Sequence, residues 1–269
     1  MKSEHLLHPA LTVDQPIQIL VAGAGGNGSA IALWLPFLHQ AMKVWGFRHG
    51  LHVTLADGDV VTETNCVRQP FSASDIGLNK AVVLINRINL FYGLNWSAHP
   101  KHLRKDSLKS KTPPHIVIGC VDTRKARQQI LQLVSGPKKN TVYWLDLGNN
   151  ADSGQYVLGQ PLNSVNRRKA TRLRTVAELY PEIADPRVGE DPLPSCSALE
   201  ALERQQPYVN QALASSALSM LSRLFHYGRL KHHGAFFNAT TGRMSTLPVD
   251  PALWQRTRSS TRKSLPVAA

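Results

Sequence analysis

The stretch "VAGAGGNGSAIALW", residues 21–34, decides the fold class that we expect for this chain. It starts at the end of a short apolar run, residues 17–22, and continues into residues 27–45, which have the composition of a long helix. Glycines without a Cβ atom let the backbone turn tightly and approach a phosphate, and a helix N-terminus offers free N–H groups. The stretch therefore predicts a nucleotide-binding loop, with a purely structural glycine turn as the alternative. Its residues are Gly23, Gly25, Gly26, Asn27 and Gly28.

The following residues alternate apolar runs with helical patterns. Such alternation favours right-handed crossovers and an α/β fold with a doubly wound, mostly parallel sheet. A hairpin partner at 154–159 follows the last parallel strand. We expect strands at 51–56, 96–98, 115–122 and 141–149, and helices at 78–93 and 123–134.

The domain organisation that we expect is one nucleotide-binding core followed by an extension. The core covers residues 1–159. Residues 160–195 are basic and carry prolines without clear periodicity, which is typical of a long crossover or lid loop. Residues 196–252 complete the same domain with a C-terminal helix and a hairpin. Residues 253–269 read as a basic, flexible tail.

Composition limits the class of protein. The formal net charge of +13 over 269 residues favours an acidic partner such as nucleic acid, an acidic protein or a nucleotide. The basic runs contain no interleaved aromatic residues, so nucleic acid is possible but not favoured. No apolar run is long enough to cross a bilayer, and no secretory signal is evident, so we expect a soluble, cytoplasmic protein without a membrane partner.

A second stretch, "DGDVVTETNCVRQP" at residues 57–70, extends the prediction from nucleotide binding to chemistry. Asp57 ends a strand, where a carboxylate can bind ribose hydroxyls, as it would in a dehydrogenase. Arg68 and Lys80 add two cations that suit a triphosphate attacked at its α-phosphorus. Asp122, after a later strand, can hold Mg²⁺. The alternative readings are surface cations and an Asp122 that caps the next helix.

These motifs together resemble those of a known family. "GAGGNG", "DGDVVTETNCVRQ", Lys80 and "GCVDTRKAR" resemble the ThiF/MoeB/ubiquitin-activating-enzyme adenylation family over roughly residues 16–150. More narrowly, "LPSCSALEAL" and "NQALASSALSMLSRLF" resemble the PRTRC-system ThiF family proteins of mobile bacterial elements. The resemblance implies a Rossmann-like homodimer that uses ATP and Mg²⁺ to adenylate the C-terminal glycine of a ubiquitin-like protein, with a conjugating enzyme as a possible further partner.

The resemblance also assigns roles to residues. The glycine loop with Asn27 would cradle ATP, and Asp57 would bind ribose, with Asp59 among the nucleotide contacts. Asn65, Arg68 and Lys80 would contact phosphates, Asp122 would position Mg²⁺, and Arg127 would support that loop. The chain departs from the family pattern at Asn27 and at Cys66, where other residues are usual. Residues 1–16 contain no arginine that could act across a dimer interface, and the paired C-x-x-C zinc motifs are missing.

Cys196 is the candidate nucleophile for a later thioester step, because it precedes a helix whose N-terminus would lower the thiol pKa. In the alternative reading a neighbouring serine caps the helix and Cys196 only packs. Cys66 and Cys120 read as packing residues, and the histidines at 226, 232 and 233 as surface residues. Three other functions stay open: a tRNA-modifying adenylating enzyme, a non-catalytic nucleotide-binding module and, more distantly, an NAD oxidoreductase.

Overall fold

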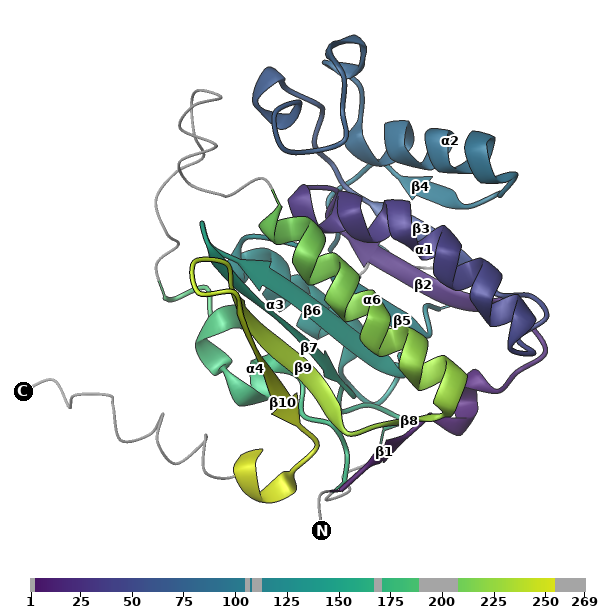
Figure 1. The fold of residues 1–269 in the computed structure, drawn as a ribbon, viewed down its shortest axis with the longest axis vertical. Helices are drawn as coiled ribbons and strands as arrows, with labels where there is room; N and C mark the ends of the chain where they lie inside the picture. Colours follow the sequence, from purple (N-terminus) through teal and green to yellow (C-terminus); the bar gives the residue numbers. More distant parts are fainter. Residues whose placement is uncertain (1–2, 105–106, 108–112, 167–170, 189–207, 255–269) are drawn as a thin grey trace, which may run out of the picture.

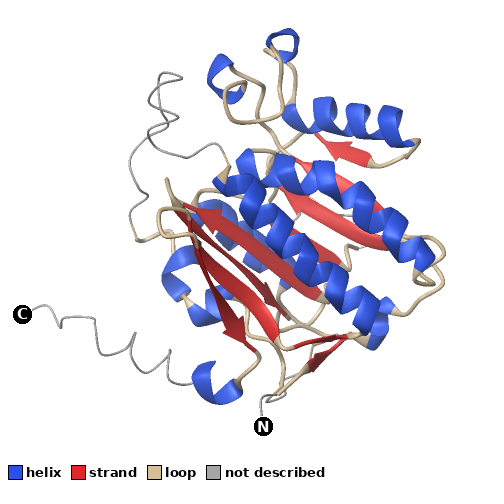
Figure 2. Cartoon of the chain, viewed as in Figure 1, coloured by secondary structure: helices blue, strands red, loops and turns tan. Residues whose placement is uncertain are grey.

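The computed structural model describes residues 3–104, 107, 113–166, 171–188 and 208–254. Its centre is an eight-stranded mixed sheet in the order β10-β9-β7-β6-β5-β2-β3-β4 (Figures 1 and 2). Five neighbouring strands are parallel: β2 (Ile17–Ala22), β3 (Leu51–Ala56), β4 (Ser97–His99), β5 (Ile116–Gly119) and β6 (Tyr143–Asn149). Three more extend the sheet with antiparallel pairings: β7 (Ser153–Gly159), β9 (His232–Asn238) and β10 (Arg243–Pro248).

Helices cover both faces of the sheet (Figure 1). On one face α1 (Gly26–Val44) and α6 (Val209–Tyr227) lie side by side, and α2 (Lys80–Tyr92) packs next to α1 against the β3–β4 edge. On the other face lies α3 (Arg124–Val134), which contacts β5. With both faces covered, the parallel strands need continuous apolar runs, and β5 is buried at all of its positions. The expected fold class is therefore confirmed.

The switch point of the sheet sets the place of a ligand site. From β2 the chain goes to β3 and β4 on one side, and then returns to β5 on the other side of β2. In such sheets ligands bind outside the carboxyl ends of the strands where the strand order reverses. Gly23 directly follows β2, and Cys120 directly follows β5. The glycine loop therefore lies at this switch point.

The small residues of α6 serve helix packing inside the chain. Ala214 and Ala217 are fully buried, and α6 makes its most extensive contacts with α1. Short side chains let two helices approach closely, and the larger Leu213 and Leu221 of α6 are also fully buried. In the described part of the sequence, this helix is a core element.

Residues 160–188, the described part of the expected lid loop, hold two short helical turns and pack against the domain. These turns are α4 (Val176–Leu179) and the 3₁₀ turn η4 (Pro181–Ala184), which contacts α3. The buried Arg172 donates hydrogen bonds to the main-chain oxygen of Gln160 and to the carboxylate of Glu178. These bonds fix this stretch to β7.

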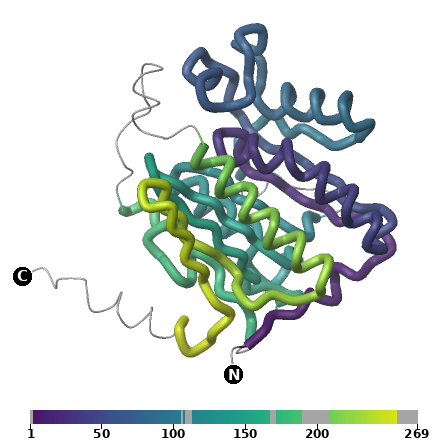
Figure 3. The backbone as a smooth tube through the Cα atoms, viewed as in Figure 1, coloured from purple at the N-terminus to yellow at the C-terminus, as the bar shows by residue number. Residues whose placement is uncertain are grey.

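Three further features complete the fold. The two-residue strand β1 (His5–Leu6) pairs with β8 (Arg229–Leu230), which brings the beginning of the chain next to the end of α6 (Figure 3). Short 3₁₀ turns occur at η1 (Pro9–Leu11), η2 (Glu63–Asn65) and η3 (Ala73–Asp75), and residues 251–254 form a helical turn. Among the described residues, no helix combines the length and the apolar character that a membrane span requires.

One surface expectation was wrong. His233 is fully buried, because β9 lies between β7 and β10 and alternate residues of a strand face the core. His226 is exposed, and His232 is partly buried. The remainder of the expected flexible tail, 255–269, lies outside the described residues.

Candidate functional site

The glycine loop is shaped by two close backbone contacts. Gly23 has a φ of +96°, and a Cβ atom there would lie 2.6 Å from the main-chain oxygen of Cys120. A Cβ atom on Gly28 would lie 1.8 Å from the main-chain oxygen of Gly23. Only glycine fits either position without moving backbone. By contrast, a Cβ atom on Gly25 would meet nothing within 4 Å, so this residue borders open space at the start of α1.

Asp57 ties the glycine loop to the end of β3. Its Oδ2 accepts a hydrogen bond of 2.5 Å from the main-chain N–H of Ala24, and its Oδ1 accepts one of 2.8 Å from that of Asp59. Burial raises the pKa of the Asp57 carboxyl, and the two N–H donors act in the opposite direction. This carboxylate therefore holds the loop, and each oxygen keeps a second lone pair with which a ligand hydroxyl could bond.

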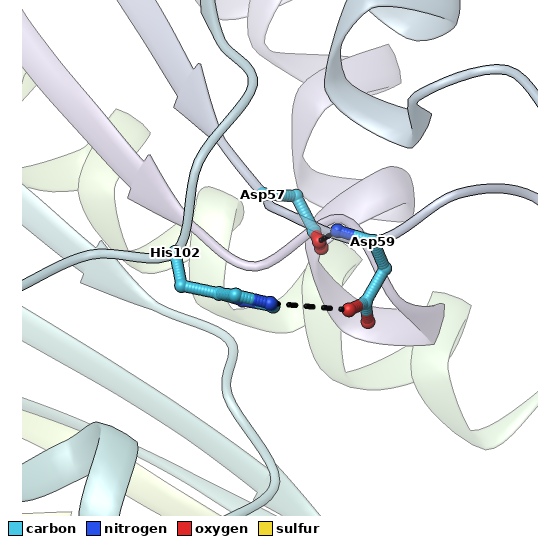
Figure 4. A group of neighbouring side chains, drawn as sticks. All are labelled: Asp57, Asp59 and His102. Atoms are coloured by element: carbon cyan, nitrogen blue, oxygen red, sulfur yellow. Dashed lines mark hydrogen bonds and ion pairs between the residues drawn. The ribbon is translucent and has the colours of Figure 1, made fainter.

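Asp59 lies next to Asp57 and contacts two further side chains, those of Lys80 and His102. Figure 4 shows the two aspartates and His102. The ammonium of Lys80 lies 3.6 Å from Oδ2 of Asp59, and Nε2 of His102 lies 3.6 Å from Oδ1. The Lys80 side chain is only 10% exposed. Lys80 is the first residue of α2 and directly follows Asn79. Asn79 caps α2 and donates to the main-chain oxygens of Asp57 and Asp59.

Arg68 and Asp122 belong to two different loops and are close enough to interact electrostatically. Burial lowers the pKa of the Arg68 guanidinium, and the nearby Asp122 carboxylate raises it. Asp122 is exposed after the end of β5. The cap of α3 is Thr123, whose hydroxyl accepts from the main-chain N–H of Ala126, so the structure does not support the reading of Asp122 as the cap.

A buried ion pair between Arg127 and Asp146 lies next to the Asp122 loop and is hydrogen-bonded to its main chain. The guanidinium of Arg127 lies 3.3 Å from Oδ2 of Asp146, and it donates to the main-chain oxygens of Asp122 and Leu147. Burial raises the pKa of Asp146 to about 6, although Arg127 lowers it. Arg127 thus reaches the loop as the family resemblance implies.

Asn27 and Asn65 both make bonds within the protein. The Asn27 amide donates to Oδ1 of Asn149 at 2.9 Å, which joins the start of α1 to the end of β6. The Oδ1 of Asn65 accepts from the main-chain N–H of Thr62 at 3.0 Å and closes the 3₁₀ turn η2. These contacts give both residues a structural part, and the phosphate contact expected of Asn65 stays a prediction.

The structure describes the surroundings of two of the three cysteines. Burial raises the pKa of the Cys120 thiol, so it stays protonated at neutral pH and packs between β5 and the glycine loop. The thiol of Cys66 lies 3.7 Å from the main-chain oxygen of Thr62. Cys196, the candidate nucleophile, lies outside the described residues.

Two places in the structure carry carboxylates that could hold a metal ion. Single ligand atoms of Asp57, Asp59 and His102 lie within 4.8 Å of one another (Figure 4). One of the three ligands is a histidine nitrogen and Asp59 is paired with the ammonium of Lys80, so this group is a poor fit for Mg²⁺, which prefers oxygen ligands. The exposed carboxylate of Asp122 fits Mg²⁺ better, because one carboxylate together with phosphate oxygens is its common ligand set.

Several residues of the site were not anticipated. Asn210, at the start of α6, lies against the glycine loop, since a Cβ atom on Gly26 would be 2.1 Å from its Nδ2. His102 and Asn79 come from the loop after β4 and the cap of α2. The "LNK" cap signal before a helical run could have identified Asn79. Nothing local in the sequence marks Asn210.

The structure has a Rossmann-like α/β fold whose strand ends carry paired acids and cations. The model of the ThiF family matches residues 15–248, and the chain belongs to this family. That match continues through the C-terminal hairpin, well beyond the residues 16–150 on which the motif resemblance rests. The narrower resemblance to PRTRC-system proteins stays a prediction.

Solved structures share the fold at low sequence identity. PaaA is 14% identical, with 86% of this chain and 64% of that chain covered and a TM-score of 0.56. MccB of E. coli is 15% identical, with 87% of this chain and 62% of that chain covered and a TM-score of 0.57. The structure of MccB with ATP is 17% identical, with 87% of this chain and 64% of that chain covered and a TM-score of 0.54. The chain thus spans less than two thirds of the length of these proteins. No curated protein matches it.

Proposed function

We propose that this protein is an ATP-dependent adenylating enzyme that activates a carboxylate as an acyl-adenylate. One observation carries the proposal: cations and acids from separate loops meet around the glycine loop. Lys80 pairs with Asp59 and interacts electrostatically with Asp57 on the β3 side, and Arg68 interacts electrostatically with Asp122 on the β5 side. Membership of the ThiF family and the fold shared with MccB, which has been solved with ATP, support this function.

The reaction follows from charge and position. A carboxylate oxygen of the substrate attacks the α-phosphorus of ATP, the bond from that phosphorus to the bridging oxygen breaks, and pyrophosphate leaves with its electron pair. Negative charge grows on the phosphate oxygens, where Arg68 and Lys80 stabilise it. No protein nucleophile is needed, because holding the two reactants in line supplies much of the rate.

Asp122 is the residue that we propose to hold Mg²⁺. Its carboxylate is exposed, and it interacts electrostatically with Arg68. When bound, the metal would supply positive charge that neutralises part of the charge of the phosphates. Arg127 fixes the main chain at Asp122 and thereby positions this carboxylate.

The acyl substrate that we favour is the C-terminal glycine of a ubiquitin-like protein, on the strength of the motif resemblance. We further propose that Cys196 accepts the acyl group as a thioester, that the enzyme is a homodimer and that a conjugating enzyme receives the product. A thiol-dependent, hydroxylamine-sensitive adduct that is lost in Cys196→Ala would support the thioester step. An adduct that persists in this variant would exclude Cys196.

Exchange of labelled pyrophosphate into ATP tests the proposed reaction. We expect exchange that depends on a candidate ubiquitin-like protein ending in glycine, and a loss of at least about 100-fold in Lys80→Met and Asp122→Ala. Lys43→Met is the matched control, because Lys43 is an exposed lysine near the far end of α1. Exchange that is strong in Asp122→Ala would contradict the Mg²⁺ assignment.

A second function, a tRNA-modifying adenylating enzyme, is favoured by one observation, the net charge of +13. An enzyme that neutralises many phosphates releases counterions, so its affinity falls steeply with salt. RNA that copurifies with the protein, together with such salt dependence, would favour this function. Nucleotide binding without exchange for any carboxylate would instead indicate a non-catalytic module.

A further inference from the structure

Helices α1 and α6 end on the same side of the molecule, next to β8 (Figure 1). There the loop after α1 contacts the last turn of α6. We call the solvent-facing side chains of residues 45–48 and 223–231 the α1–α6 end surface. Trp45 lies 19 residues after Gly26, and at 1.5 Å per helical residue this corresponds to about 28 Å. The surface is therefore separate from the glycine loop and its acids and cations.

Four planar side chains form a series on this surface. The rings of Trp45 and His226 are stacked, with centroids 4.4 Å apart and 3° between their planes. His226 also stacks with Tyr227, with centroids 4.3 Å apart and 29° between the planes. The guanidinium carbon of Arg223 lies 5.0 Å from the centre of the Tyr227 ring. Flat groups in such a series stack well with further flat groups.

The series is supported by the core at one end and exposed at the other. Trp45 is partly buried and packs against the core, and nearby the rings of Phe47 and Phe225 meet edge to face at 5.4 Å. Tyr227, in contrast, is 56% exposed, and Arg223 is exposed as well. Nucleobases stack on exposed aromatic rings and on the plane of an arginine side chain. The exposed end therefore offers a place for a base.

Cations surround this series. Arg48 is exposed in the loop after α1, and Arg229 and Lys231 are exposed on the segment after α6. The carboxylate of Glu4 lies 3.5 Å from the guanidinium of Arg229 and 3.8 Å from the ammonium of Lys231. Neither Arg48 nor Arg223 forms an ion pair with another residue that the structure describes. The surface therefore holds more cations than its acid can neutralise.

The helix ends account for only part of this positive charge. The C-termini of α1 and α6 each carry about half a negative charge, which cations in the last turn stabilise. Those two helix ends and Glu4 together offset about two of the four cations named above. The remaining excess attracts phosphates, in keeping with the net charge of +13 of the whole chain.

We infer that the α1–α6 end surface binds single-stranded nucleic acid. A base stacks at the exposed end of the series, on Tyr227 and Arg223, and the neighbouring phosphates contact Arg48, Arg229 and Lys231. Bases of a double helix are already stacked on one another, so the surface selects single strands. The inference goes beyond the proposed adenylation and does not depend on it. No run of the sequence interleaves these aromatic and basic residues, because the fold alone brings the two helix ends together.

Photocrosslinking locates the strand directly. The probes are an oligouridylate of about 12 nucleotides with one 4-thiouridine and the corresponding oligothymidylate with one 4-thiothymidine, so that the two arms distinguish RNA from DNA. We expect mass spectrometry to find adducts of at least one probe on residues 45–48 or 223–231. Adducts confined to other residues, or no adducts with either probe, overturn the inference.

Variants decide whether stacking carries the binding. Fluorescence anisotropy of the same strands, labelled with fluorescein, should show a loss of affinity of about tenfold in Tyr227→Ala and almost none in Tyr227→Phe, which keeps the ring. Phe91→Ala is the matched control, because Phe91 is an exposed aromatic residue on α2, away from this surface.

The salt dependence tests the charged contacts. Arg223→Met should weaken binding and reduce the slope of log affinity against log salt by about 0.7, which is the share of one phosphate contact in a single strand. Arg243→Met is its control, because Arg243 is exposed on the edge strand β10. Thermal unfolding of each variant shows that it is folded.

The outcomes separate this inference from the alternatives. Affinity that is unchanged in Tyr227→Ala, or that falls equally in Tyr227→Phe, overturns it, and so does equally tight binding of a duplex of the same length. Polyglutamate that displaces the strand as well as unlabelled strand does overturns it by assigning the surface to acidic proteins. None of these measurements involves pyrophosphate exchange, so a failure of the proposed adenylation is seen separately.

Discussion

The side-chain amide of Asn210 occupies the space that a Cβ atom on Gly26 would need: such a Cβ would lie 2.1 Å from Nδ2 of Asn210. The two residues belong to the first turns of α6 and α1. Asn210 is almost fully buried, at 1% exposure. The beginning of α6 is therefore packed directly against the glycine loop, and the C-terminal third of the chain helps to shape the candidate site.

Alanine substitutions in the glycine loop should separate into three grades. Gly25→Ala should cost only about 1 kcal/mol or less, because its Cβ meets nothing within 4 Å and only the preference for glycine over alanine at the N-cap of α1 is lost. Gly26→Ala should cost about 1–3 kcal/mol, because it must displace Asn210. Gly28→Ala should cost the most, because its Cβ would lie 1.8 Å from the backbone at Gly23. Urea unfolding measures all three.

The cause of the Gly26→Ala effect can be isolated with a second substitution. If the clash with Asn210 is responsible, the double variant Gly26→Ala, Asn210→Gly should lose clearly less stability than the sum of the two single variants. Simple additivity would show that the contact with Asn210 is not the cause of the loss in Gly26→Ala.

The buried pair of Arg127 and Asp146 should be costly to break on one side. Arg127→Ala leaves the Asp146 carboxyl buried without its counter-ion, and we expect a loss of about 3–5 kcal/mol in the free energy of unfolding. The double variant Arg127→Met, Asp146→Leu should recover most of this stability, since apolar residues of similar size replace such pairs well. It should not recover pyrophosphate exchange, because the bond to the main chain at Asp122 is lost.

The fold core could be predicted from sequence because its signals are local. The strands at Ile17–Ala22 and Leu51–Ala56 coincide with their expected bounds, since continuous apolar runs end at a glycine or an aspartate. Alternation of strand and helix then restricts the topology to right-handed crossovers. The same rule places the glycine loop, Asp57 and Asp122 at one edge of the sheet before any coordinate is known.

The parts that could not be predicted depend on long-range contacts. The pairing of β1 with β8 joins two-residue strands without periodicity, and the Asn210 contact joins residues from opposite ends of the chain. The 3.6 Å contact of His102 with Asp59 depends on a loop after β4. One signal was available and not used: Thr175 and Glu178 form a capping box, which marks α4.

Two buried histidines should make the protein less stable in mild acid. Burial is the main cause that lowers the pKa of both His5 and His233 to about 4. The unfolded chain, with histidine pKa near 6.5, binds more protons between pH 6.5 and 4, so stability falls as pH falls through this window. Each histidine should cost about 2 kcal/mol at pH 5 relative to pH 7. Asp146, whose pKa is raised to about 6, has the opposite slope.

Because of that opposing slope, the measurement must compare variants. Between pH 7 and pH 5, the free energy of unfolding should fall by about 2 kcal/mol less in His233→Phe than in the natural protein, whatever the absolute stability of the variant. His49→Gln is the control, since His49 lies on the surface with a side chain 45% exposed. Equal slopes in His233→Phe and the natural protein would show that His233 does not resist protonation in the folded state.

Asp57 should prove structural and functional at once. In Asp57→Asn one carboxylate oxygen becomes an NH₂ group, which accepts no hydrogen bond. The side chain can then no longer accept hydrogen bonds from the main-chain N–H groups of both Ala24 and Asp59 in the present geometry. We expect a loss of about 1–3 kcal/mol in the free energy of unfolding, because a buried N–H loses its partner, and at least about a tenfold loss of ATP affinity. Asp14→Asn is the control, because this aspartate is exposed and far from the loop. A fall in ATP affinity without a fall in stability would mean that the carboxylate serves only the ligand. A fall in stability alone, with ATP affinity retained, would remove Asp57 from the nucleotide site and leave it as the tie between β3 and the glycine loop.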